Sequence, residues 1–86
     1  MFRFLIESPN DPEDCELIVQ EIHNAGYLHH FDWGCHDGVH SGWAIIETDT
    51  IEHARQIVPW RVREKARIVK IEKYEGEDEI HPHKKK

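Results

Sequence analysis

The alternation of apolar and polar positions predicts four strands and two helices along this chain. In residues 2–7, Phe2, Phe4 and Ile6 fall on one face, and the residues between them fall on the other. This period of two is typical of a half-buried strand. The same reasoning predicts further strands over residues 27–33, 39–47 and 66–74, with helices over residues 12–25 and 51–58.

The first predicted helix has clear signals at both ends. Asp11 stands at the N-cap, Pro12 takes the first helical position, and Gly26 follows the last turn. Because Cys15 begins the apolar stripe of this helix, we expect it to be a packed core thiol. The stripe consists of Cys15, Ile18, Val19, Ile22 and Ala25.

The second predicted helix begins after the segment Thr48-Asp49-Thr50. Asp49 and Glu52 have the spacing of a capping box there. Pro59 ends the helix, and residues 60–64 are expected to form a loop. The predicted buried side consists of Ile51, Ala54, Ile57 and Val58.

The resulting β-α-β-β-α-β order is that of the split βαβ, or ferredoxin-like, fold. Its sheet has four antiparallel strands, and both helices cover one face. We expect one α+β domain over residues 1–75 and a flexible charged tail over residues 76–86. A chain of 86 residues buries a modest share of its surface, so we expect a homodimer formed through the open sheet face.

The segment from His29 to Trp43 holds four of the eight histidines, one of the two cysteines and two of the three tryptophans. Asp37-Gly38 within it predicts a two-residue hairpin turn, which pairs Cys35 with His40 and sorts the side chains between two faces. A turn that is one residue longer would exchange the two faces. The face toward the helices is predicted to carry His29, Phe31, Trp33, Cys35, His40, Gly42, Ala44 and Ile46. The open face is predicted to carry His30, Asp32, Gly34, His36, Val39, Ser41, Trp43 and Ile45. In the last strand, Val69 and Ile71 are predicted to point inward, and Ile68, Lys70 and Glu72 outward.

This arrangement predicts a polar, aromatic-lined pocket on the open face. His30 and His36 are the candidate catalytic residues for proton transfer, and Asp32 is the carboxylate that would orient them. The alternative is that these histidines only form local hydrogen bonds on a polar surface. The candidate substrate-binding residues are Arg3 for an anionic group, Trp43 for stacking, and Glu7 and Ser41.

Cys35 and His40 are candidate metal ligands, because the predicted pairing brings their Cβ atoms about 5 Å apart. A thiolate and an imidazole suit a divalent transition metal such as Zn, Ni or Cu. His36 is the third candidate, although its side chain is predicted on the other face, and His29 or a partner-chain residue is the alternative. The chain has no CxxC and no HExxH pattern.

Composition narrows the classes of function. The net charge is −6, and the chain is 38% hydrophobic and 33% charged, which is typical of a globular protein. Overall acidity argues against a nucleic-acid partner, and no apolar run is long enough to enter a membrane. Two cysteines in different elements favour free thiols and a cytoplasmic location. Residues 61–73 are basic, which we interpret as a solvated strand that balances the acidic half.

The element order over residues 2–74 resembles the small dimeric α+β-barrel proteins. These include muconolactone-isomerase-like proteins and cofactor-free antibiotic-biosynthesis-type monooxygenases. The FDWGCHDGVHSGW segment is most similar to an uncharacterised branch of that superfamily. The resemblance implies a homodimer in which two open sheets face each other. It is one of architecture, and no catalytic motif of the family can be placed on this chain residue by residue.

Three functions fit these patterns. The one we favour is a homodimer that binds a small molecule or a metal ion at the His, Asp and Trp side chains of the open face. The second is a cofactor-free isomerase or monooxygenase acting on a small aromatic acid. The third is a non-catalytic dimeric interaction module with a flat interface centred on Trp43 and Ile45.

Overall fold

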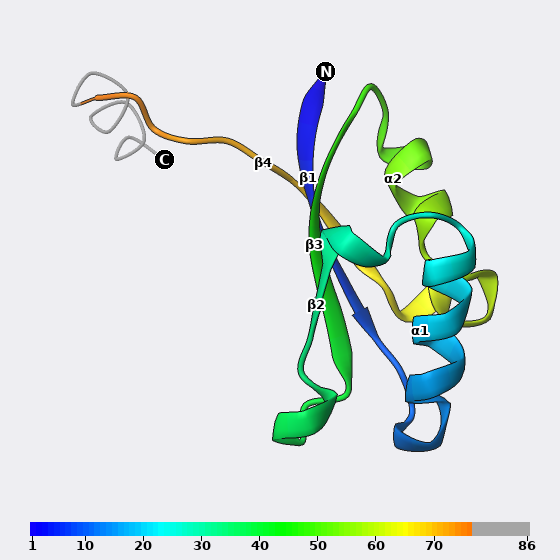
Figure 1. Cartoon of the computed structure of the whole chain (residues 1–86). Coiled ribbons are helices and arrows are strands. Elements are labelled where there is room, and N and C mark those ends of the chain that lie inside the picture. Colours follow the sequence, from blue (N-terminus) through cyan, green and yellow to red (C-terminus); the bar gives the residue numbers. More distant parts are fainter. Residues whose placement is uncertain (77–86) are drawn as a thin grey trace.

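The computed structural model describes residues 1–76 and has the predicted ferredoxin-like α+β architecture. Its strands form one antiparallel sheet in the order β2-β3-β1-β4, and both helices lie on one face of that sheet (Figure 1). Most of the predicted tail, residues 77–86, lies outside the described residues. The strands are β1 (Phe2–Pro9), β2 (Phe31–Trp33), β3 (Ser41–Thr48) and β4 (Arg67–Ile71), and the helices are α1 (Cys15–Asn24) and α2 (Ile51–Ile57).

Short 3-10 helices lie at several of the places where the sequence predicts the ends of strands and helices or a loop. The helix predicted from Pro12 becomes α-helical only at Cys15, because the Asp14 N–H donates to the Asp11 carbonyl at 2.9 Å, three residues back. Residues 28–30 form a helical turn where a strand is predicted, and the predicted loop after Pro59 is also helical. The 3-10 helices are η1 (Pro12–Asp14), η2 (Leu28–His30), η3 (Cys35–Asp37) and η4 (Trp60–Lys65).

The hydrophobic core lies between the sheet and the two helices. Ile6 of β1 and Ile18 and Ile22 of α1 are fully buried there. The predicted apolar stripe of α1 is confirmed in its middle but not at its ends, where Cys15 is half-buried and Ala25 is exposed. The core consists of Phe4, Ile6, Ile18, Ile22, Phe31, Ala44, Ile46, Ala54, Ile57, Val58 and Val62.

The helix termini follow local backbone chemistry. Gly26 ends α1 with a φ of 90°, a conformation that glycine adopts without strain. The Thr50 hydroxyl accepts a hydrogen bond from the His53 N–H at 3.2 Å, so Thr50 is the N-cap of α2. The predicted capping box at Asp49 is therefore wrong. The Asp49 carboxylate instead lies 3.9 Å from the N-terminal amine.

The predicted pairing of β2 with β3 is confirmed. Phe31 lies opposite Ala44, and Trp33 lies opposite Gly42. Phe31, Ala44 and Ile46 are buried against the helices, as expected for that face. The faces predicted for the paired residues of β2 and β3 are therefore confirmed.

The connection between these strands is longer than the predicted two-residue turn, and that prediction is wrong. The Gly34 carbonyl accepts hydrogen bonds from the N–H groups of Asp37 and Val39, both at 3.0 Å. These bonds wind residues 35–37 into η3, and the following glycine closes the turn with a φ of 84°. Cys35 and His40 therefore leave the ladder, and alternation no longer fixes where they point.

β4 presents the opposite faces from those predicted. Leu5 of β1 lies opposite Val69, and Ile6 lies opposite Ile68. Because Ile6 is fully buried, its partner Ile68 packs against the core. A shift of one residue exchanges the faces of a strand. Ile68 and Lys70 lie on the helix side, and Val69 and Ile71 lie on the open side.

Replacing Gly34 with alanine is expected to destabilise the fold by about 1–3 kcal/mol. A Cβ at this position would lie 2.7 Å from the Val39 carbonyl oxygen and 3.0 Å from the Trp43 ring. The φ of −103° suits any residue, so the penalty is steric. Urea unfolding followed by tryptophan fluorescence measures it. Gly76→Ala is the control, because its Cβ would meet nothing within 4 Å. Equal stability of Gly34→Ala and wild type would contradict this turn geometry.

Candidate metal centre

The start of α1 and the tip of the β2–β3 connection lie at the same end of the sheet (Figure 1). The β1–β3 ladder ends where Pro9 lies opposite Ser41. The Asn10 N–H then donates to the His40 carbonyl at 3.0 Å and extends the pairing by one residue. Because η1 turns the chain directly into α1, Cys15 begins that helix beside His40.

Asn10 is buried at this junction and fixes its geometry. Its side-chain amide donates to the Asp11 carbonyl at 2.7 Å and to the Cys15 sulfur at 3.1 Å. Only 7% of Asn10 is exposed. The position of the Cys15 sulfur is thus set by a polar contact and not by packing in the core.

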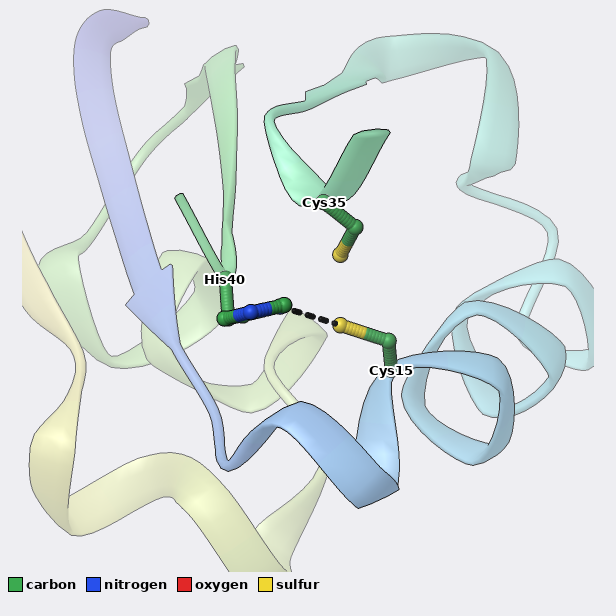
Figure 2. Close-up of side chains that lie close together, drawn as sticks. All are labelled: Cys15, Cys35 and His40. Carbon is green, nitrogen blue, oxygen red and sulfur yellow. Dashed lines mark hydrogen bonds between the residues drawn. The ribbon is translucent and has the colours of Figure 1, made fainter. Parts of the chain in front are cut away.

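Three side chains converge in front of this junction: Cys15, Cys35 and His40 point toward one another (Figure 2). Their sulfur and ring-nitrogen atoms all lie within 4.8 Å of one another. His40 Nδ1 is 3.4 Å from the Cys15 sulfur. Zinc ligands lie about 2.3 Å (sulfur) and 2.0–2.1 Å (nitrogen) from the metal, so they are roughly 3.5–4 Å apart. A small inward movement reaches that spacing, and the cluster could therefore hold a metal ion.

Two of the predicted metal ligands, Cys35 and His40, belong to this cluster. The third member is Cys15, and the expectation that it is a packed core thiol is wrong. As the first residue of α1 it lies at the end of the core, where it contacts polar groups. His36 and His29 are exposed and lie outside the cluster. The signal that could have found Cys15 is topological, because the helix after β1 must start at the end of the sheet where β3 begins.

A cleft of about 810 Å³ opens beside the cluster, between α1 and the hairpin tip. All three cluster residues lie in its wall. Because the described residues supply three ligands, a bound ion would keep a coordination position for water or for a ligand from this cleft. The other polar side chains of the wall are Glu13, Glu16, Gln20 and His36.

The electrostatics of the cluster keep Cys35 neutral without metal. Burial, followed by the hydrogen bond and the charge of Cys15, raises the pKa of the Cys35 thiol from 9.0 to about 11. Two adjacent thiolates repel each other unless a cation lies between them. Metal binding must therefore displace a proton from Cys35, so the metal affinity should fall as the pH falls.

The candidate catalytic residues do not share one cleft. His36 lines the cleft beside α1. His30 lines a second cleft of about 880 Å³, together with Arg3. Asp32 is exposed on the open face, opposite Trp43. The structure therefore places the two histidines in different clefts, whereas the strict alternation of the predicted hairpin put them on one face.

Of the candidate substrate-binding residues, Trp43 and Glu7 contact each other within the fold, and Ser41 is buried. The Trp43 ring N–H donates to the Glu7 carboxylate at 3.4 Å, across the β1–β3 ladder. The Trp43 ring also covers Gly34. Ser41 is only 4% exposed, and its hydroxyl has no hydrogen-bond partner among the described residues. Part of the Trp43 surface is thus already used to hold the hairpin on the sheet.

The basic stretch over residues 61–73 pairs in part with the protein itself. The Arg61 guanidinium donates to both carboxylate oxygens of Glu21, at 2.9 and 3.2 Å. Arg63 donates to the Val58 carbonyl at 2.8 and 3.0 Å. The Arg61–Glu21 pair supports the interpretation that this stretch balances the acidic part of the chain. The stretch is not one strand, because its first part forms η4 and only residues 67–71 form β4.

Comparisons with known proteins do not assign the chain to a family. No protein-family model matches it, and neither the curated proteins nor the solved structures give a match. The resemblance to dimeric α+β-barrel proteins therefore stays a prediction, whereas the ferredoxin-like element order is observed directly. Within residues 1–76, no helix combines the length and the apolar composition that crossing a bilayer requires.

The metal-free protein is expected to lose stability as the pH rises from about 9 to about 11. In the unfolded chain the Cys35 thiol ionises near its ordinary pKa of 9.0, whereas in the folded protein its pKa is about 11. Between these values the unfolded state binds fewer protons than the folded state, so the free energy of unfolding falls as the pH rises. Urea unfolding across this range measures the slope. Cys35→Ser should give a shallower slope, and equal slopes would refute this origin of the effect.

Proposed function

We propose that this protein binds a zinc ion through Cys15, Cys35 and His40. The observation that carries the proposal is the convergence of two thiols and an imidazole within 4.8 Å. Thiolate and imidazole ligands suit zinc and copper, and imidazole also suits nickel. Zinc is the ion that we propose, because zinc sites in proteins are commonly built from Cys and His side chains.

The proposed ion joins three segments of the chain. Its ligands come from the first turn of α1, from η3 and from the residue before β3. Because these segments are apart in the unfolded chain, zinc binding should stabilise the folded state. Three protein ligands with an open fourth position are the pattern of catalytic zinc sites, whereas structural sites have four. The open position beside the cleft would allow a small molecule to bind at the metal.

Calorimetric titration of the metal-free, full-length protein with zinc is expected to show one ion per chain. His40→Ala and Cys15→Ser should each weaken the affinity at least about 100-fold, because each removes one of three ligands. Titration with Co²⁺ provides an independent readout, since tetrahedral cobalt with thiolate ligands absorbs strongly in the visible range. Unchanged affinity in both variants would exclude the site.

Two further variants separate this site from the other histidines. His36→Ala removes an exposed ring outside the cluster and should leave the zinc affinity unchanged. The double substitution His81→Ala/His83→Ala removes two tail histidines that lie outside the described residues, and it should also leave the affinity unchanged. Binding that survives His40→Ala but disappears without the tail histidines would place the metal elsewhere.

We also propose that the open sheet face pairs with a second copy of this chain. Its central row is apolar, and Ile45 and Val69 are 49% and 37% exposed. An exposed apolar face on so small a domain favours association. Three rows of side chains cross this face, and the central row consists of Ile45, Leu5 and Val69. One flanking row consists of Asp32, Trp43, Glu7 and Arg67. The other flanking row consists of Glu47, Arg3 and Ile71.

The charges of the open face complement themselves under a two-fold axis. An axis that runs along the strands between β1 and β3 lays β3 over the partner's β1, and β2 over the partner's β4. Ile45 then meets Leu5 of the partner subunit, and Glu47 meets Arg3 of the partner subunit. Asp32 meets Arg67 of the partner subunit. Opposite charges thus flank an apolar centre, as a self-complementary interface requires.

Ile45→Glu is expected to convert a dimer into a folded monomer. Ile45 is 49% exposed, so a carboxylate there is tolerated by one chain but would lie against apolar Leu5 in the dimer. Sedimentation at micromolar concentration measures the change. Leu17→Glu is the matched control, because Leu17 is 43% exposed on α1, away from this face. A monomeric wild type, or equal association of both variants, would rule out this interface.

A further inference from the structure

We propose that Cys15 and Cys35 form a redox-active pair, which a small-molecule disulfide oxidises to an intrachain disulfide bond. The two thiols are free, and their sulfur atoms lie within 4.8 Å of each other. Both line one open cleft, so a small oxidant can reach them. This chemistry does not require the proposed zinc ion; only its consequence for the metal rests on the proposed function.

The two sulfurs approach from two different elements of the chain. Cys15 starts α1, whereas Cys35 lies in η3, a single turn between Gly34 and Gly38. A disulfide bond needs the sulfurs about 2.05 Å apart, with the Cβ atoms about 3.5–4.5 Å apart. Rotation of the side chains or a small shift of the η3 turn would close the remaining distance. The hairpin tip is thus the part of the site that would adjust.

The contacts around the two sulfurs assign them different roles. The Cys15 sulfur accepts a hydrogen bond from the Asn10 amide at 3.1 Å, and it lies 3.4 Å from His40 Nδ1. In the tautomer with Nδ1 unprotonated, His40 can take the thiol proton as the sulfur attacks. Cys35 has no such pair of polar partners among the described residues. Cys15 is therefore the attacking sulfur, and Cys35 is the resolving one.

The reaction proceeds in two exchange steps. First, Cys15 gives its proton to His40, and its sulfur attacks one sulfur of the small disulfide; a mixed disulfide forms, and the released thiolate takes up that proton. Second, the Cys35 sulfur attacks the Cys15 sulfur of the mixed disulfide and loses its own proton to the second leaving thiolate. Two protein thiols are oxidised to one disulfide bond, and the small disulfide is reduced to two thiols.

The disulfide bond and the proposed zinc ion exclude each other, because both need the same two sulfurs. Cysteine binds zinc as a thiolate, and a disulfide bond contains no thiolate. If zinc binds as proposed, oxidation of the pair should release it. The same cluster would then report the thiol–disulfide balance of its surroundings, as transient cytosolic disulfides do.

The test is a reaction of the metal-free, full-length protein with oxidised glutathione in the presence of a chelator, followed by intact mass spectrometry. The wild type should lose two hydrogen atoms per chain and retain no glutathione. Cys35→Ser should stop at a mixed disulfide on Cys15. Cys15→Ser should react at least about tenfold more slowly, because Cys35 lacks the contacts with Asn10 and His40.

Several results would overturn the proposal. Wild type that carries glutathione on both cysteines, or that links only to other chains on a non-reducing gel, would do so. Equal rates for the two single variants would refute the assigned roles. The metal titration is a separate measurement, so a chain that forms the bond but binds no zinc refutes only the proposed function. A chain that binds zinc but forms no bond refutes only the redox pair.

Discussion

The antiparallel ladder between β1 and β3 is the constraint on which the candidate site depends. It runs from Phe2 opposite Thr48 to Pro9 opposite Ser41, and Asn10 extends it through the His40 carbonyl. The buried Asn10 amide then reaches the Cys15 sulfur. Backbone pairing thus brings together Cys15 and His40, which are 25 positions apart in the sequence, without any contribution from a metal. Main-chain hydrogen bonds therefore determine where the side chains of the cluster lie, and these bonds do not depend on what occupies the cleft.

The period of the sequence predicted the faces of the β2–β3 ladder but not the path of the chain between these strands. Trp33 opposite Gly42 follows from alternation, and the fit is close because a Cβ at Gly42 would lie 2.7 Å from the Trp33 ring. Past Trp33, the two hydrogen bonds to the Gly34 carbonyl wind the chain into η3, and the period of two no longer applies. The positions of Cys35 and His36 depend on those bonds, which no pattern of side chains encodes. This is why Cys35 and His40 were predicted as ligands, whereas the position of His36 in the cleft beside α1 was not.

Two other predictions, the faces of β4 and the role of Cys15, were wrong for the same reason. A local sequence pattern does not show which distant residues will be neighbours in the fold. In β4, Ile68 and Val69 are adjacent apolar residues, so the pattern alone cannot decide which of them faces the core. Pairing with β1 decides it, because Ile6 is buried and lies opposite Ile68. Cys15 fitted an apolar stripe by spacing, yet its surroundings are set by Asn10 and by the hairpin tip. In both cases the role of a side chain depends on a neighbour that is distant in the sequence but adjacent in the fold.

The cluster and the apolar row of the open face lie on opposite sides of the sheet. The proposed chemistry of the cysteines is therefore separated in space from the proposed association of two chains. The cluster faces α1, whereas Ile45, Leu5 and Val69 face away from both helices. The proposed ligation or oxidation of the cysteines would change the hairpin tip, which contributes no residue to the central apolar row. Coupling between association and the cysteine site would therefore have to pass through the sheet itself. Trp43 makes a contact of that kind, because its ring covers Gly34 at the base of the tip and its N–H reaches Glu7 on the open face. A shift of η3 that accompanies metal binding or disulfide formation would therefore act on the open face through this side chain.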